Sequence, residues 1–188
     1  AICRAHGKSC TGNDTRGILL AQDKWRAKAV LRAAAVPCPP DVLAPLGKTP
    51  PFAGFLERRC IVKPALSDAS EGIDAAAVVE GDRAALEKAV ARVHREFGQP
   101  ALIEPFVGER ELNVSVVERN GKVEVLPIAE ISFEAFGEDR PRIVGYEAKW
   151  VSGSFEFHNT PRVIPAPLAP AEAEGVRYLA LAAWEALD

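Results

Sequence analysis

The spacing of apolar residues predicts helices near both ends of the chain. Residues 14–35 have helical spacing, and we expect two helical segments there that meet near Asp23. Prolines end this run, so the proline-rich stretch 39–54 is predicted to be a loop or short connection. A last helix is expected over about 170–187. It should bury one apolar stripe, made of Val176, Leu179, Ala180, Ala183 and Leu187.

Short apolar runs between these helices predict a mixed α/β unit. Residues 60–62 should form a strand broken by Pro64, and residues 76–79 and 101–104 should form two more strands. A helix should run from an N-cap at Asp82 to Phe97 and stop at Gly98. One face of that helix carries the apolar side chains of Leu86, Val90, Val93 and Phe97.

Alternating apolar residues around Asn120-Gly121 predict a β-hairpin. This dipeptide favours a two-residue turn, which would pair Val116 with Val125 and Glu118 with Val123. Because side chains alternate along a strand, the two sides of the hairpin should differ. The apolar side is expected to hold Leu112, Val114, Val116, Val123 and Val125, whereas Glu111, Asn113 and Ser115 point the other way. Residues 133–169 are predicted to be irregular.

Composition narrows the class of protein. The 188 residues are 48% hydrophobic and 26% charged, which suits one large domain or two small ones, and the net charge of −3 gives no basic field for nucleic acid. No apolar run is long enough to span a membrane. Cysteines at 3, 10, 38 and 60 form no CxxC pair, so we expect reduced thiols, as in the cytoplasm.

The ends of the chain suggest a piece of a longer protein. The sequence contains no methionine, and residues 1–7 are typical of the end of a helix capped by a glycine. We therefore expect a fragment, although a mature chain with its start removed would also fit.

Three segments carry candidate chemistry. Lys63 ends a buried strand, where an anion such as phosphate could pair with it, although a lysine can also reach the surface from a strand end. The small residues of 65–72 could approach phosphates, or could form an ordinary turn. In 104–111 a strand, a connector and an acid could bind a purine and a ribose, or could simply be a polar interdomain turn.

Taken together, these segments resemble one family. In order, the sequence has Asp23-Lys24, Val36-Pro37, Ile61-Val62-Lys63-Pro64, Asp68-Ala69-Ser70-Glu71-Gly72-Ile73, Glu104-Pro105-Phe106-Val107-Gly108-Glu109-Arg110-Glu111 and Tyr146-Glu147-Ala148-Lys149-Trp150. This order and spacing resemble the D-alanine–D-alanine ligase family of the ATP-grasp superfamily over nearly the whole chain. Thr11-Gly12-Asn13-Asp14 and Ile164-Pro165-Ala166 fit the same pattern.

The resemblance implies roles for particular residues. Lys24, Lys63 and Lys149 would face the phosphates of ATP, with Lys63 and Lys149 acting in catalysis. Residues 67–72, with Ser70, would form the loop that covers the phosphates. Glu104, Pro105 and Val107 would surround adenine, with Pro105 offering its carbonyl group, and Glu111 would bind ribose.

The resemblance also implies a fold and a reaction. We expect an α/β (α+β) ATP-grasp fold, with the end of an N-terminal substrate domain and a linker helix in 1–24, a central and lid subdomain in 25–107, and an incomplete C-terminal subdomain in 108–188. ATP would phosphorylate a carboxylate, and an amine would displace the phosphate. The cofactors would be ATP and Mg²⁺. The residues that bind Mg²⁺ are expected beyond the end of this chain, so no metal ligand is expected within it. The 188 residues alone should therefore be inactive.

Partners and departures follow from the same resemblance. The partners would be small molecules, namely ATP and D-alanine or a similar amino acid, with no nucleic acid or membrane partner. The enzyme would be cytoplasmic and would act in peptidoglycan and cell-wall synthesis. It could be a homodimer. Ala69 replaces a serine and Trp150 a tyrosine of many members, which puts their usual hydrogen-bonded link in doubt. Another ATP-grasp amino-acid ligase, or a non-catalytic nucleotide-binding module, would also fit.

Overall fold

The first part of the chain forms three helices. The computed structural model describes residues 2–8 and 11–187, and it begins with α1 (Ile2–Ala5), α2 (Thr15–Gln22) and α3 (Lys24–Ala33). Asp23 ends α2 and also caps α3, where its side chain accepts a hydrogen bond of 3.0 Å from the backbone N–H of Arg26. The prediction of two helical segments that meet near Asp23 is therefore confirmed.

A four-stranded antiparallel sheet follows in the order β1-β4-β2-β3. Its strands are β1 (Val42–Ala44), β2 (Cys60–Pro64), β3 (Val78–Val79) and β4 (Ala101–Pro105). Three sequence predictions were wrong here. The stretch 39–54 contains β1, which pairs with β4, and residues 75–77 form a short 3₁₀ helix (Ala75–Ala77) before β3. Pro64 ends β2 rather than breaking it.

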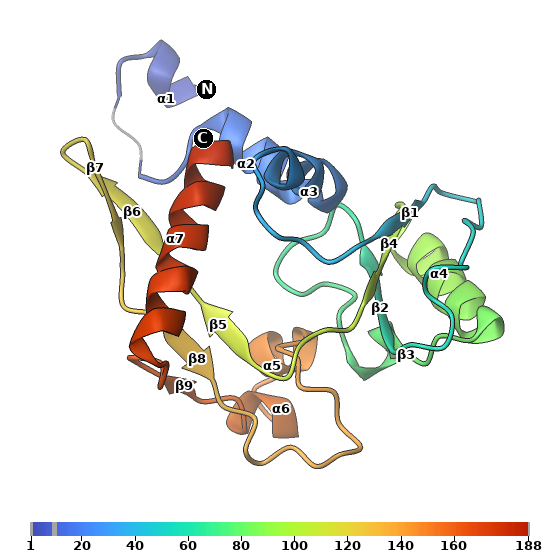
Figure 1. Cartoon of the computed structure of the whole chain (residues 1–188). Helices are drawn as coiled ribbons and strands as arrows, with labels where there is room; N and C mark the ends of the chain where they lie inside the picture. The colour runs from blue at the N-terminus through green and yellow to red at the C-terminus, as the bar shows by residue number, and fades with distance from the viewer. Residues whose placement is uncertain (1, 9–10, 188) are drawn as a thin grey trace.

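Helix α4 (Arg83–Phe97) packs on this sheet and encloses the main core. Its cap at Asp82 and its left-handed Gly98 are as predicted. Figure 1 shows α4 lying against this sheet. The apolar face of α4 meets side chains from the strands and from the loop before β2. The buried cluster consists of Ala44, Phe52, Phe55, Cys60, Val62, Leu86, Ala89, Val90, Val93, Ala101 and Ile103.

The second half of the chain is more open. It contains β5 (Glu111–Asn113), β6 (Val116–Arg119), β7 (Lys122–Val125), β8 (Ala129–Ile131), α5 (Tyr146–Trp150), α6 (Phe155–His158), β9 (Arg162–Val163) and α7 (Pro170–Leu187). The hairpin register, with Val116 opposite Val125, is confirmed. The irregular stretch 133–169 was a wrong prediction, since it holds two short helices and a strand that pairs with β8.

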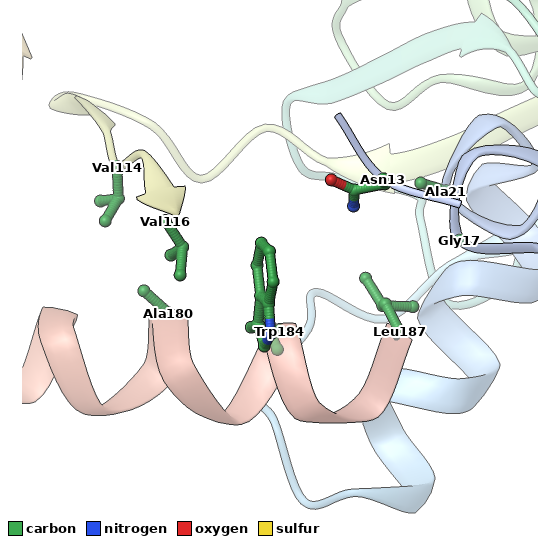
Figure 2. Close-up of a pocket in the computed structure, with 9 residues that line it drawn as sticks. Asn13, Gly17, Ala21, Val114, Val116, Ala180, Trp184 and Leu187 are labelled. Atoms are coloured by element: carbon green, nitrogen blue, oxygen red, sulfur yellow. The ribbon is translucent and has the colours of Figure 1, made fainter. Parts of the chain in front are cut away.

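Helix α7 has the predicted bounds but not the predicted burial. None of its residues is fully buried, and Leu179 remains 38% exposed. The helix lies along the β6–β7 hairpin, and Figure 2 shows Val114 and Val116 facing it across a cavity of about 290 Å³. Two residues of the predicted apolar side, Val114 and Val116, are therefore directed toward α7, but the contact leaves space unfilled.

Cysteine chemistry and membrane spans can be assessed for the described residues. Cys3, Cys38 and Cys60 are free thiols, whereas Cys10 lies outside the described residues. Among the helices of 2–8 and 11–187, none has the length and apolar character needed to cross a bilayer.

Gly72 provides a test of the packing between β2 and α4. It has φ of +72°, and a Cβ there would lie 2.6 Å from Pro64 Cγ and 2.9 Å from Phe97 Cζ. Gly98 has a similar φ of +62° but open space around it. Gly98→Ala should cost about 1 kcal/mol of unfolding free energy for the left-handed backbone alone, and Gly72→Ala should cost clearly more. Urea unfolding measures both, and equal losses would contradict the packing argument.

Candidate functional site

Lys63 and Glu104 form an ion pair across the central strands of the first sheet. In the β2–β4 register, Lys63 lies opposite Leu102, which makes Glu104 its diagonal neighbour on the same face. The Lys63 ammonium nitrogen lies 2.5 Å from Glu104 Oε2. Glu104 is only 6% exposed, so its charge requires a partner inside the protein.

Lys24 lies beside this pair at the first turn of α3. Its backbone N–H donates to the carbonyl of Ala65 at 3.1 Å, and its ammonium group donates to the carbonyl of Ser67. Burial, and then the positive charge of Lys63, lower the pKa of Lys24 below the usual lysine value. Two ammonium groups therefore lie close enough to repel each other, an arrangement that a bound polyanion would stabilise.

A second set of charges lies behind Glu104. Its other carboxylate oxygen, Oε1, accepts a hydrogen bond from Lys28. The Lys28 ammonium also lies 2.8 Å from Asp41 Oδ2, which in turn lies 2.6 Å from the guanidinium of Arg32. Asp41 Oδ2 makes no well-aligned hydrogen bond, so these two contacts are ion pairs in unfavourable hydrogen-bond geometry.

The loop 66–72 is held over this region by the segment 144–150. The Ser70 hydroxyl donates to the carbonyl of Val144 at 2.9 Å, and the indole N–H of Trp150 donates to the carbonyl of Ala69 at 2.9 Å. Ala69 and Ser70 both have positive φ, 52° and 64°, which non-glycine residues rarely adopt. The link that the substitutions at 69 and 150 put in doubt is thus present here, through a backbone carbonyl.

Glu111 joins the same segment from the other half of the chain. It begins β5, and its Oε2 accepts a hydrogen bond of 3.1 Å from the backbone N–H of Val144. Val144 therefore lies between Glu111 and Ser70. Nearby, the Tyr146 N–H donates to the carbonyl of Ile73 at 2.7 Å and ties α5 to the end of the loop.

The connector after β4 leads from Glu104 toward Glu111. Pro105 is half-buried, and Val107 is 70% exposed. The N–H of Phe106 donates to the carbonyl of Arg59 at 2.8 Å, which fixes the start of the connector. A cavity of about 400 Å³ adjoins it and is lined by Arg59, Phe106, Val107, Gly108, Glu109, Gly137, Glu138, Arg140 and Arg142.

The structure brings most of the predicted site residues into two linked groups. Lys24, Lys63 and Glu104 form one, and Ser70 and Glu111, joined through Val144, form the other. Lys149 is exposed in the last turn of α5, next to Trp150. Pro105 and Val107 follow Glu104 directly along the chain.

Sequence reasoning missed Lys28 and Asp41. One signal was available, because Lys24, Lys28 and Arg32 are spaced four residues apart and therefore share one face of α3. Three cations on one helix face, of which Lys28 is buried, indicate anionic partners. Nothing in the sequence pattern identified those partners as Asp41 and Glu104.

Comparison with known proteins identifies the class of fold. The solved D-alanine–D-alanine ligase of Bacillus anthracis, in a complex with ATP, matches 99% of this chain and 53% of its own, with a TM-score of 0.71 and 20% identity. The VanG D-Ala:D-Ser ligase of Enterococcus faecalis matches 99% of this chain and 50% of its own, with a TM-score of 0.70 and 18% identity. The fold is therefore that of the ATP-grasp enzymes, as the sequence motifs predicted.

Sequence comparison identifies the family. The family described as "D-ala D-ala ligase C-terminus" matches residues 54–188, and the chain belongs to it. The D-alanine–D-alanine ligase of Acidiphilium cryptum is 32% identical over 177 residues, which is 94% of this chain and 52% of the relative. The chain thus spans about half the length of the curated relatives that it matches.

The Trp150–Ala69 contact gives a testable prediction. Trp150→Phe keeps an aromatic ring but deletes the indole N–H, so loop 66–72 should open more often. A net hydrogen-bond contribution of about 1 kcal/mol corresponds to roughly fivefold faster amide exchange in that loop. Hydrogen exchange read by mass spectrometry measures this, with Trp25→Phe on the surface of α3 as the matched control. Unchanged exchange in the loop would show that the contact does not hold it.

The lowered pKa of Lys24 predicts a pH dependence. Anion binding needs the charged ammonium, and Lys24 loses its proton at a lower pH than the ordinary lysine value of about 10.4. Affinity for inorganic triphosphate should therefore fall as the pH rises through this lowered pKa. Calorimetry across alkaline pH should show the fall in the wild type but not in Lys24→Met. Identical pH profiles for the two proteins would show that Lys24 does not bind the anion.

Proposed function

We propose that this chain carries the ATP-binding part of a ligase that joins an amino acid, D-alanine or a similar one, to an amine. The supporting observation is that two ammonium groups lie near each other beside loop 66–72, that of Lys63 paired with the buried Glu104 and that of Lys24 bonded to the Ser67 carbonyl. Membership of the D-alanine–D-alanine ligase family supports the reaction class. In a bacterial cell such an enzyme would serve peptidoglycan synthesis.

The proposed roles follow from charge and position. Lys24 and Lys63 would bind the phosphates of ATP, and loop 66–72 would cover them. The connector residues Pro105 and Val107 would offer backbone groups to adenine, and Glu111 would accept hydrogen bonds from ribose. Lys149, exposed on α5 next to the loop, would reach the phosphates from the opposite side.

The same charges would serve the chemistry. Transfer of the terminal phosphoryl group to a carboxylate spreads negative charge over its oxygens, and fixed cations lower the free energy of that transition state. The resulting acyl phosphate is attacked by an amine, which forms the amide and expels phosphate. Lys63 and Lys149 are the side chains that we propose for the catalytic part of this stabilisation.

Magnesium would accompany ATP in the proposed reaction and bridge its phosphates. Within 2–8 and 11–187, no cluster of three or more His, Cys, Asp or Glu side chains has the arrangement of a metal site. Among the described residues, the cations that we assign to the phosphates are lysines, and no step is assigned to a metal ion.

The identity of the amino acids requires an assay. Two structural relatives are named for different products, one as a D-alanine–D-alanine ligase and one as a D-Ala:D-Ser ligase. ADP release by the protein as the cell makes it should depend on D-alanine, alone or together with D-serine. If the protein binds ATP but neither amino acid stimulates the release of ADP, a non-catalytic nucleotide-binding module would be favoured.

Replacement of Lys63 tests the proposed mechanism. Lys63→Met keeps the apolar stem and deletes the charge, so the rate constant should fall by about a hundredfold, and ATP affinity should fall less. Steady-state kinetics of the protein as the cell makes it, with a thermal melt to show folding, measures this. Lys88→Met on the exposed face of α4 is the matched control. A folded Lys63→Met variant with full turnover would show that Lys63 has no catalytic role and is only a lysine at the end of a strand.

A further inference from the structure

Lys28 is a buried lysine outside the proposed ATP contacts. It is 8% exposed, and its ammonium contacts two carboxylates, Asp41 at 2.8 Å and Glu104. A buried ammonium is costly unless anions compensate for the lost water, so both contacts are needed to keep the charge inside. The proposed reaction assigns no role to the Lys28 ammonium.

The contacts of Lys28 continue to the phosphate site. Arg32 and Lys28 share Asp41, Lys28 and Lys63 share Glu104, and each oxygen of Glu104 contacts a different lysine. The charges therefore alternate from the surface end of α3 to the strand end of β2. Lys63 is the last member, and its ammonium is the one that lies near Lys24.

We propose that Lys28 is a positioning residue, which acts through Glu104 to fix the Lys63 ammonium for phosphate binding. The inference rests on the proposed function, since it takes Lys63 as a phosphate ligand. Lys63 has a flexible stem with four rotatable bonds, so without a fixed partner its ammonium would be spread over many positions. Lys28 holds Oε1 of Glu104, and this leaves Oε2 at one position for Lys63.

Sharing the carboxylate has a second consequence. A carboxylate that served Lys63 alone would hold that ammonium strongly and would compete with an incoming phosphate. Because Lys28 takes part of the carboxylate's charge, Lys63 is oriented yet can still bind an anion. Asp41 stabilises this arrangement, since its Oδ2 lies 2.8 Å from the Lys28 ammonium nitrogen.

The positioning role predicts a split between phosphate and base binding. In Lys28→Met, the affinities for ATP and for inorganic triphosphate should fall by about tenfold, because one charge-assisted contact is misplaced. The affinity for adenosine, which has no phosphate, should stay within about twofold. Lys28→Arg keeps the charge and should restore most of the loss. A merely structural role would lower the melting temperature and weaken all three ligands alike.

Calorimetry with the three probes decides between these outcomes, with Lys88→Met as the surface control. If Lys28→Met does not fold, Lys28→Gln keeps a hydrogen-bond donor without the charge and should give the same split. Equal losses for adenosine and triphosphate, or no loss for either, would overturn the positioning role.

A second measurement separates this inference from the proposed function. If the wild type binds neither ATP nor triphosphate, the proposed function fails. Acetylation of Lys63 by acetic anhydride still tests whether Lys28 acts on Lys63 through Glu104. Lys63 should react several-fold more slowly in the folded Lys28 variant, because Glu104 then pairs with Lys63 alone. Mass spectrometry compares the rates with those in wild type and Lys88→Met, and equal rates would overturn the inference.

Discussion

The buried carboxylate of Glu104 connects three elements through its two oxygens. It lies on β4, one oxygen contacts Lys28 of α3, and the other contacts Lys63 of β2. Removing one partner from such a buried pair costs about 3–5 kcal/mol, because a charge is then left without compensation. The packing of α3 against the sheet and the position of the Lys63 ammonium therefore depend on the same group.

Loop 66–72 shows how a family pattern tolerates side-chain changes. Ala69 has no polar side chain, yet its carbonyl receives the indole N–H of Trp150. Because every residue has a backbone carbonyl, this link does not require a particular side chain at position 69. The positive φ angles at Ala69 and Ser70 cost of order 1–3 kcal/mol each, and the contacts of Trp150 and Ser70 help to offset that cost.

Burial differs sharply between the two halves of the chain. The first sheet and α4 enclose a continuous core that includes the fully buried Phe52 and Leu86. Helix α7 has no fully buried residue, and a cavity lined by Trp184, Val114 and Val116 lies between its C-terminal part and the start of the β6–β7 hairpin (Figure 2). Since hydrophobic burial supplies most of the free energy of folding, the first half should be the more stable part.

The sequence by itself determined the features that depend on neighbouring residues. The helix boundary near Asp23, the cap at Asp82, the stop at Gly98 and the turn at 120–121 each involve groups within a few residues, so their patterns predicted α3, α4 and the hairpin register. The ordered motifs likewise predicted the family and the fold. Only the tertiary structure showed β1, whose strand character comes from pairing with β4, and the contacts Lys28–Glu104 and Trp150–Ala69, which join residues 76 and 81 positions apart. Local propensity carries no information about such partners, because their energy exists only after the chain has brought them together.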